Sequence, residues 1–302
     1  MIGIVILNYR NWEDTKRCVE SIAEYPPRGM YAIILVDNAS DRCPPFDLSA
    51  FLIKHHIVFI RNKKNLGYNA GNNVGIAKAR EIGCEEILLS NNDVRYLPNS
   101  IQAMQSYLRS HPQVGIVGPK ILDLDGRVQK SNLCRKTGMK EKYMVRTRAN
   151  LIFRKNCCTY FGYNRDYDQT FRVYAVLGCC FMLSAACVQA VTPLDEYPFL
   201  YEEELMLGIR MEEKGFYTVY YPKAVVEHLH GGSTRHGKAA AFMQNVRSEI
   251  YYCRKYLHAP KWQIYPLYLY RTLLYLARCV GSREFCRNCG QYFRITGREL
   301  RK

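Results

Sequence analysis

A cluster of oxygen-bearing side chains follows the apolar residues of the segment LLSNND at 88–93. Asparagine and aspartate are common turn formers, but their oxygens are also ligands that hard divalent cations prefer. Asn8 follows the apolar run GIVIL in the same way, and Asp37 ends the run YAIILVD. If the fold brings these three segments together, they could hold a metal ion with the phosphate groups of a ligand.

A second cluster could act as an acid or a base. Glu202, Glu203 and Glu204 are consecutive and lie in an amphipathic helical pattern over 199–216. Adjacent carboxylates repel one another, which raises the pKa of at least one of them toward a value that suits a general base. Glutamates in a first helical turn also interact favourably with the helix dipole, by about 0.3–1 kcal/mol each, and we expect no more than this of Glu202.

Two histidines, His228 and His230, stand just before the sequence GGST. A neutral imidazole can act as a ligand for Mn²⁺. The alternative is that each is a structural histidine with its hydrogen bonds satisfied inside the fold.

The elements that must position these groups are indicated by hydrophobic periodicity. Apolar runs alternate with helical patterns in the first hundred residues, which predicts a parallel, Rossmann-like half-sheet. Strands are predicted at 3–7, 31–37, 57–62 and 86–90, and helices at 13–23 and 69–83. Ligands of such sheets bind beyond the carboxyl ends of the strands, where Asn8, Asp37 and Asn91 to Asp93 all fall. The segment NYRNWED after the first strand has no glycine, which argues against a dinucleotide-binding domain.

The second half of the chain is less regular. We predict a strand and turn over 114–126, an apolar strand that continues into a helix over 173–188, and a strand over 217–222. Residues 130–170 hold 10 Lys/Arg against 3 Asp/Glu and show little periodicity. This segment is predicted to be a substrate-facing insertion or a mobile loop region.

Seven segments in this order together resemble glycosyltransferase family 2, in the branch that builds rhamnan, O-antigen and capsule chains. They are VILNYRN, ILVDNAS, NKKNLGYNAGNNVGI, LLSNND, VLGCCFMLS, LDEYPFLYEEELMLGIRMEEKGF and VVEHLHGGST. The resemblance spans residues 1–235 and implies an α/β GT-A fold, a Rossmann-like mixed sheet flanked by helices. It also implies a nucleotide-binding half at 1–100, an acceptor half at 101–235, and inverting transfer of a sugar from a nucleotide sugar with Mn²⁺ or Mg²⁺.

The resemblance also assigns roles to residues. Glu204 corresponds to the general base, with Glu203 second, and Asp93 to the metal carboxylate, with His228 or His230 beside it. The residues that match the donor-binding positions are Asn8, Tyr9, Asp37, Asn65, Gly67, Asn91, Asn92 and Asp93. Three positions depart from the family pattern. Asn91 opens the Asp-x-Asp-like motif, Glu204 stands in place of an aspartate, and Met206 stands where the family has a further aspartate.

The C-terminal region, 236–302, is predicted to be a basic, aromatic-rich helical appendage. The net charge of the chain is +16, and 14 Lys/Arg against 3 Glu follow from Arg235 onward. The stretch WQIYPLYLYRTLLYLARCV at 262–280 suits the anionic interface of a membrane, and a helical hairpin packed on the main domain is the alternative. Nucleic acid would also attract this charge but is not expected as a partner.

The chain starts without the basic segment of a signal peptide, and no stretch reaches the roughly 18–20 apolar residues of a membrane span. We therefore expect a cytoplasmic protein, peripheral on the inner face of the cell membrane. Its expected substrates are a UDP- or dTDP-sugar and a glycan acceptor, lipid-linked or oligosaccharide, in capsule or O-antigen synthesis. The alternative is a catalytically degenerate family member that acts as a binding or scaffold subunit of a glycan assembly complex.

Overall fold

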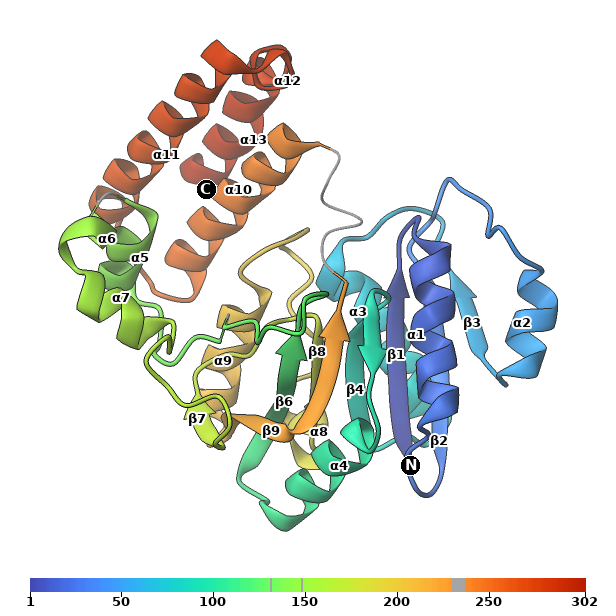
Figure 1. Cartoon of the computed structure of the whole chain (residues 1–302). Coiled ribbons are helices and arrows are strands. Elements are labelled where there is room, and N and C mark those ends of the chain that lie inside the picture. The colour runs from blue at the N-terminus through green and yellow to red at the C-terminus, as the bar shows by residue number, and fades with distance from the viewer. Residues whose placement is uncertain (131, 148, 230–236) are drawn as a thin grey trace.

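A nine-stranded mixed β-sheet forms the centre of the computed structural model, which describes residues 1–130, 132–147, 149–229 and 237–302. The strand order is β3-β2-β1-β4-β8-β6-β9-β5, and β7 pairs with β9. Figure 1 shows this sheet flanked by helices, with a bundle of C-terminal helices packed at one end. The expected α/β architecture, a Rossmann-like mixed sheet with helices around it, is confirmed.

The first four strands are parallel to one another and follow the predicted apolar runs. They are β1 Ile2–Asn8, β2 Tyr31–Asp37, β3 Val58–Arg61 and β4 Glu86–Asn91. The remaining strands are β5 Val94–Tyr96, β6 Val114–Leu122, β7 Phe171–Val173, β8 Cys180–Leu183 and β9 Tyr217–His228. β8 runs antiparallel to β4 and β6, which makes the sheet mixed.

Helices cover both faces of the sheet because the strands bury side chains on both. The helices here are α1 Trp12–Glu24, α2 Leu48–Lys54, α3 Tyr68–Glu81, α4 Ser100–Ser110, α8 Ala185–Val191 and α9 Glu203–Glu213. Alternate residues of β1 enter different cores: Ile4 packs with α1 and α4, whereas Val5 packs with α3. This alternation is the period-2 pattern of a strand buried on both sides.

Helix α3 lies unusually close to the sheet because glycines line its inner face. A Cβ atom on Gly71 would stand 2.7 Å from Cδ1 of Leu7, and one on Gly75 would stand 2.3 Å from Cγ1 of Val5. Glycine at these two positions therefore allows the helix to pack closely on the sheet. The close approach fixes the first turn of α3 at the carboxyl edge of the strands.

The insertion between β6 and β7 is more ordered than the sequence predicted. It contains three short helices, α5 Met139–Arg146, α6 Ala149–Ile152 and α7 Arg154–Tyr160. The expectation of a loop region was wrong in this respect. Helices of two turns or fewer span too few residues to produce a recognisable hydrophobic period.

The elements around the acid triplet also differ from their predicted bounds. The apolar run at 173–188 is interrupted, so that β8 covers only four residues before α8. Helix α9 starts at Glu203 rather than near 199, because Tyr201 and Glu202 adopt left-handed backbone conformations with φ of 76° and 71°. Strand β9 continues to His228, since it pairs with β7 at one end and with β5 at the other.

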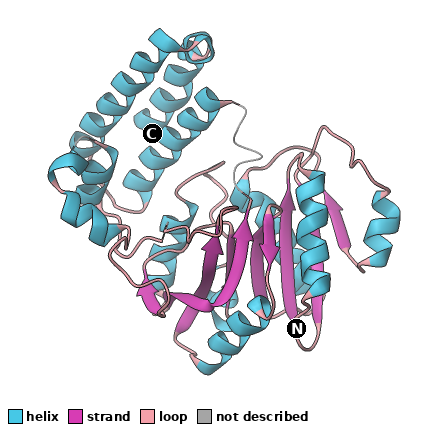
Figure 2. Cartoon of the chain, viewed as in Figure 1, coloured by secondary structure: helices cyan, strands magenta, loops and turns pink. Residues whose placement is uncertain are grey.

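Four helices form the C-terminal bundle, where a hairpin was one expectation. They are α10 Lys238–Lys255, α11 Lys261–Gly281, α12 Arg283–Arg287 and α13 Cys289–Arg301. Figure 2 shows that this part of the molecule is entirely helical. The tyrosines Tyr252, Tyr275 and Tyr292 are fully buried in its core, which also takes in Met206 and Ile209 of α9. Among the residues described, no helix is long and apolar enough to cross a membrane.

Candidate active site

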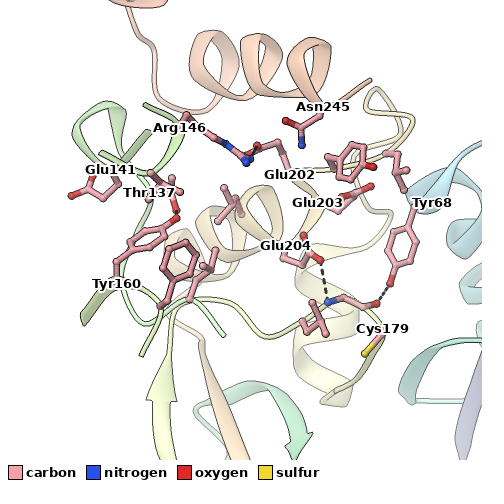
Figure 3. Close-up of a pocket in the computed structure, with 18 of the residues that line it drawn as sticks. Tyr68, Thr137, Glu141, Arg146, Tyr160, Cys179, Glu202, Glu203, Glu204 and Asn245 are labelled. Atoms are coloured by element: carbon pink, nitrogen blue, oxygen red, sulfur yellow. Dashed lines mark hydrogen bonds and ion pairs between the residues drawn. The ribbon is translucent and has the colours of Figure 1, made fainter. Parts of the chain in front are cut away.

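A cavity of about 600 Å³ lies between the sheet edge, α9, the insertion and the C-terminal bundle. Its lining brings together five of the residues singled out from the sequence, namely Asn91, Asp93, Glu203, Glu204 and His228. Figure 3 shows the glutamates at its centre, with the insertion on one side and α10 on the other. The candidate metal ligands and the candidate base therefore line one cavity.

The pairing of β5 with β9 forms the end of the cavity that contains the candidate metal ligands Asp93 and His228. Val94 pairs with His228, and the Leu229 amide donates to the carbonyl oxygen of Asp93, 2.9 Å away. This register places Nε2 of His228 3.3 Å from Oδ1 of Asp93. The Oδ1 atom is buried and accepts no hydrogen bond. A buried carboxylate oxygen beside an imidazole suits a divalent cation whose other ligands are phosphate oxygens and water.

Few side chains at this end of the cavity could act as metal ligands. Among the described residues there is no group of three or more His, Cys, Asp or Glu side chains that could hold a metal by itself. His230 lies outside the described residues. Asp93 and His228 would therefore supply two ligands, and a Mg²⁺- or Mn²⁺-type site would be completed by the substrate.

Asn8, Asp37 and Asn92 meet at the carboxyl edge of the sheet but bond to one another rather than to the cavity. Asn8 Nδ2 donates to Asp37 Oδ1 over 3.0 Å, and Asn92 Nδ2 donates to Asn8 Oδ1 over 3.0 Å. Asn8 and Asp37 are completely buried. One atom of this group keeps acceptor capacity, because Oδ2 of Asp37 accepts no hydrogen bond and lies 3.4 Å from Nε of Arg61.

Three further residues matched to donor binding lie along the same edge, outside the cavity lining. Tyr9 is half-buried, with the Arg10 guanidinium 4.8 Å above its ring centre. Asn65 Oδ1 accepts a 2.9 Å hydrogen bond from the Gly67 amide. Gly67 has φ of 87°, and a Cβ there would stand 2.3 Å from the carbonyl oxygen of Phe199, so only glycine fits. The Tyr68 amide donates to the same carbonyl.

The acidic centre of the cavity favours protonated carboxyl groups. Burial raises the pKa of Glu203 well above its usual value, and the neighbouring Glu204 raises it further. Oε1 of Glu203 is buried and has no hydrogen-bond partner. Burial also raises the pKa of Glu204, the expected base. A carboxylate whose pKa is shifted upward takes a proton more readily, which is what a general base near neutral pH requires.

The position of Glu204 is fixed by residues that the sequence analysis did not assign. The Gly178 amide donates to Oε1 of Glu204 over 3.0 Å, and the Tyr68 hydroxyl donates to the Gly178 carbonyl (Figure 3). A Cβ on Gly178 would stand 2.3 Å from that carboxylate oxygen. Both residues lie inside segments that carry the family resemblance, NLGYNAG and VLGCC, so a signal for them was present.

Glu202 does more than interact with the helix dipole, contrary to expectation. It is buried and paired with Lys142, which is buried as well, and with Arg146 at 3.1 Å. Burial alone would raise the pKa of Glu202, but the two cations outweigh it and hold the pKa below its usual value. The two cations belong to α5, so the insertion is tied directly to the residue that precedes α9. No local pattern in the sequence indicates a pairing between residues so far apart.

The cavity wall formed by the insertion and α10 was also not identified from the sequence. It consists of insertion residues such as Thr137 and Tyr160, whose hydroxyl groups lie 2.5 Å apart, together with Asn245 of α10. Met206, which stands where the family has an aspartate, points away from the cavity into the core of the bundle. An acceptor would therefore meet polar groups from the insertion and the bundle.

Comparisons with known proteins identify the family and the fold. The family model for glycosyl transferase family 2 matches residues 3–171, more than half of the chain. The chain belongs to glycosyltransferase family 2. A similar curated protein is the N-acetylglucosaminyl-diphospho-decaprenol L-rhamnosyltransferase of Mycobacterium tuberculosis, 24% identical over 262 residues that cover 82% of each chain. The low-salt glycan biosynthesis hexosyltransferase Agl10 of Haloferax volcanii is 29% identical over 126 residues, 41% of this chain and 38% of Agl10.

Solved structures confirm the fold. GalNAc-T7, solved with UDP, GalNAc and Mn²⁺, aligns with a TM-score of 0.59 at 15% identity over 83% of this chain, which spans 49% of the GalNAc-T7 chain. The mannosyltransferase PcManGT of Pyrobaculum calidifontis, solved with GDP-Man and Mn²⁺, aligns with a TM-score of 0.54 at 13% identity over 99% of this chain and 83% of its own. The protein is therefore a glycosyltransferase of GT-A fold, as the resemblance implied.

Substitution Gly178→Ala is expected to lower kcat about 10- to 100-fold, because the added methyl group displaces the Glu204 carboxylate by roughly an ångström. The donor KM is expected to stay unchanged, since Asp93 and His228 are untouched. Steady-state kinetics of the variant check this. Gly290→Ala is the control, because a Cβ there meets no atom within 4 Å. A Gly178→Ala variant with unaltered kcat would contradict the assignment.

The raised pKa of Glu203 has a consequence for stability. Between its unfolded and folded pKa values the folded state binds more protons, so the free energy of unfolding falls as pH rises. Glu203→Gln removes this pH-dependent contribution to the free energy of unfolding. The variant should be more stable than the parent at about pH 8, and the difference should shrink near pH 4, where the carboxyl is protonated in both states. Chemical denaturation at the two pH values measures the difference in the free energy of unfolding between parent and variant. The control is Glu213→Gln, because Glu213 is exposed. Equal pH dependence of parent and Glu203→Gln would refute the assignment.

Proposed function

We propose that this protein is an inverting glycosyltransferase that uses a divalent metal and moves a sugar from a UDP- or dTDP-sugar to a lipid-linked glycan acceptor. The observation that supports this best is the single cavity with Asp93 and His228 at one end and Glu203 and Glu204 at its centre. Inversion needs a base on the side of the anomeric carbon opposite the leaving diphosphate. The separation of the two groups within one cavity suits that arrangement.

Each group has a role in this proposal. Asp93 and His228 would hold the metal, which would neutralise the charge of the departing diphosphate. Glu204 accepts the proton of the acceptor hydroxyl, and Glu203 keeps the centre of the cavity acidic and dry. Asn91 contacts the donor from the strand end. The sheet edge around Asp37 binds the nucleoside.

We assign the donor to residues 1–100, the acceptor to 101–235, and contact with the membrane to the appendage 236–302. The curated relative from Mycobacterium tuberculosis is named for an acceptor sugar on diphospho-decaprenol, and Agl10 is named for glycan biosynthesis. This likeness supports transfer to a lipid-linked acceptor, and we propose capsule or O-antigen synthesis as the setting. Such an acceptor places the enzyme at the cytoplasmic face of the membrane.

The outer face of α11 supports a membrane contact. Six large apolar side chains, between 39% and 92% exposed, recur every three or four residues and so share one face about 27 Å long. They are Trp262, Tyr265, Leu269, Leu273, Leu276 and Val280. We call this face the apolar stripe. A soluble monomer rarely leaves so large an apolar surface open to water, whereas an interfacial helix requires it.

The insertion adds a second apolar feature beside the stripe. Leu151, Ile152 and Phe153 are at least half exposed, and two exposed cations follow them. Tyr143 of α5 donates a 2.5 Å hydrogen bond to the Gln263 carbonyl in the first turn of α11. Figure 1 accordingly shows α6 beside the N-terminal end of α11. The two apolar features can therefore meet the same lipid surface.

The charge of the bundle complements anionic lipids. Its three acids are all engaged inside the protein: Glu249 with Arg146, Glu299 with Arg254, and Glu284 with the Ala239 amide. Exposed cations for which the described residues show no ion pair, such as Arg283, Arg287 and Arg294, are available to lipid headgroups. Each Lys or Arg close to an anionic surface contributes about 1 kcal/mol of binding.

The donor assignment is tested by calorimetric binding of UDP-, GDP- and dTDP-sugars with and without Mn²⁺. We expect one preferred donor, bound at least about 10-fold more weakly without metal and in Asp93→Ala, because the carboxylate that holds the metal is lost. Asp125→Ala, an exposed turn acid, is the control. If no nucleotide sugar binds in the presence of metal, the protein is a scaffold subunit and the proposal fails.

The membrane assignment is tested by sedimentation with phosphatidylglycerol vesicles. Leu269→Glu/Leu273→Glu should reduce vesicle binding at least about 10-fold, since it places two charges in the centre of the apolar stripe. The matched control, Met30→Glu/Leu124→Glu, changes two even more exposed apolar side chains on the sheet domain. Equal binding of both variants would rule out the stripe as the lipid contact.

A further inference from the structure

An open groove of about 950 Å³ runs between α10, α11 and the start of α12, next to the active-site cavity. Tyr201 and Asn245 line both spaces, so the groove and the cavity adjoin. Tyr201 directly precedes the glutamate triplet. A molecule that lies in the groove could therefore extend into the cavity that holds Glu204.

The groove is positively charged. Its lining includes Lys238, Arg271 and Arg278 and no acidic residue. In the part of the chain that the structure describes, Lys238 and Arg278 form no ion pair with any carboxylate. Glu284, which precedes the groove residue Phe285, accepts a 2.8 Å hydrogen bond from the Ala239 amide. We call this space the cationic groove.

The cations are held in place by the bundle. The Arg278 guanidinium lies 4.7 Å from the ring centre of Phe242 and 5.6 Å from that of Phe285. Arg271 is buried, donates to Asn245 Oδ1 over 2.5 Å and lies 3.6 Å from Glu249 Oε2, while its Nε has no hydrogen-bond partner. A preorganised guanidinium pair is suited to phosphate oxygens. The groove is therefore built for an anion.

We propose that the cationic groove binds the diphosphate of a lipid diphosphate-linked acceptor, whose sugar then reaches Glu204 in the adjoining cavity. The proposal rests on the proposed function and deepens it, because it gives the acceptor a binding site of its own. The donor diphosphate is assigned to Asp93 and His228, at the sheet edge. The two diphosphates are thus held by separate groups on different parts of the molecule.

The surroundings of the groove favour a lipid diphosphate over a soluble one. Its lining includes Gly281 and Ser282, directly after Val280, which is 92% exposed and ends the apolar stripe. A prenyl chain that leaves the groove at this point meets an apolar surface. Arg271 and Arg278, seven residues apart, lie on the face of α11 opposite the stripe, so one helix provides both contacts.

The test measures binding of farnesyl diphosphate and, separately, of the preferred nucleotide sugar, by calorimetry on the full chain. Lys238→Gln/Arg278→Gln should weaken binding of farnesyl diphosphate at least about 10-fold and leave nucleotide-sugar binding unchanged. Arg278→Lys should retain part of the affinity. Arg283→Gln removes an exposed cation of α12 outside the groove and is the matched control, expected to bind as the parent does.

Each other outcome is decisive. If the double variant binds farnesyl diphosphate as tightly as the parent does, the proposal is overturned. A parallel loss of nucleotide-sugar binding would also overturn it, because it would assign the groove to the donor. Inorganic diphosphate that binds as tightly as farnesyl diphosphate would overturn the assignment to a lipid. If the parent binds the nucleotide sugar but no farnesyl diphosphate, this inference fails while the proposed function stands. If it binds no nucleotide sugar, the proposed function itself fails.

Discussion

The geometry of the active site depends on one buried carboxylate, Glu202. Lys142 and Arg146 of the insertion pair with it, and Arg146 also reaches Glu249 of α10 at 3.0 Å, so three parts of the molecule meet at one point. A buried ion pair adds little net stability, because desolvation offsets the attraction, yet removing one partner costs roughly 3–5 kcal/mol. The network therefore acts mainly as a constraint on position. It fixes the insertion and the bundle relative to the first turn of α9.

That constraint determines where the two candidate bases lie. The left-handed backbone at Tyr201 and Glu202 is unfavourable for residues with a Cβ, and it persists where the surrounding structure over-determines it. The ion pairs of Glu202 are the contacts that hold this backbone conformation in place. Glu203 and Glu204 then start α9 inside the cavity, where burial raises their pKa values. By fixing the residue that precedes them, the network holds two unfavourably buried acids next to the sheet edge.

Much of this arrangement could be predicted from sequence, and the failures have a physical pattern. Continuous apolar runs indicated β1, β2 and β4, and the rule that ligands bind beyond strand ends led to Asp93. The same rule gave Asn8 a ligand-facing role, whereas its amide bonds to Asp37 and Asn92. Periodicity reports which face is buried, not which polar group is its partner. The Glu202 network joins residues sixty apart in the chain, so no local pattern could indicate it.

The two faces of α11 extend the same reasoning to the membrane. In the sequence, arginines interrupt an aromatic and aliphatic run, which reads equally well as a core helix or an interfacial one. The fold separates the two residue types: Arg271 and Arg278 turn toward α10 and the cationic groove, and the apolar side chains turn outward. Because α9 packs on both the sheet and the bundle, the helix that we propose to face lipid is connected through packed side chains to the residues that we propose for catalysis. Under that proposal the base would stand at a set height above the lipid surface, where the sugar of a diphosphate-linked acceptor would also lie.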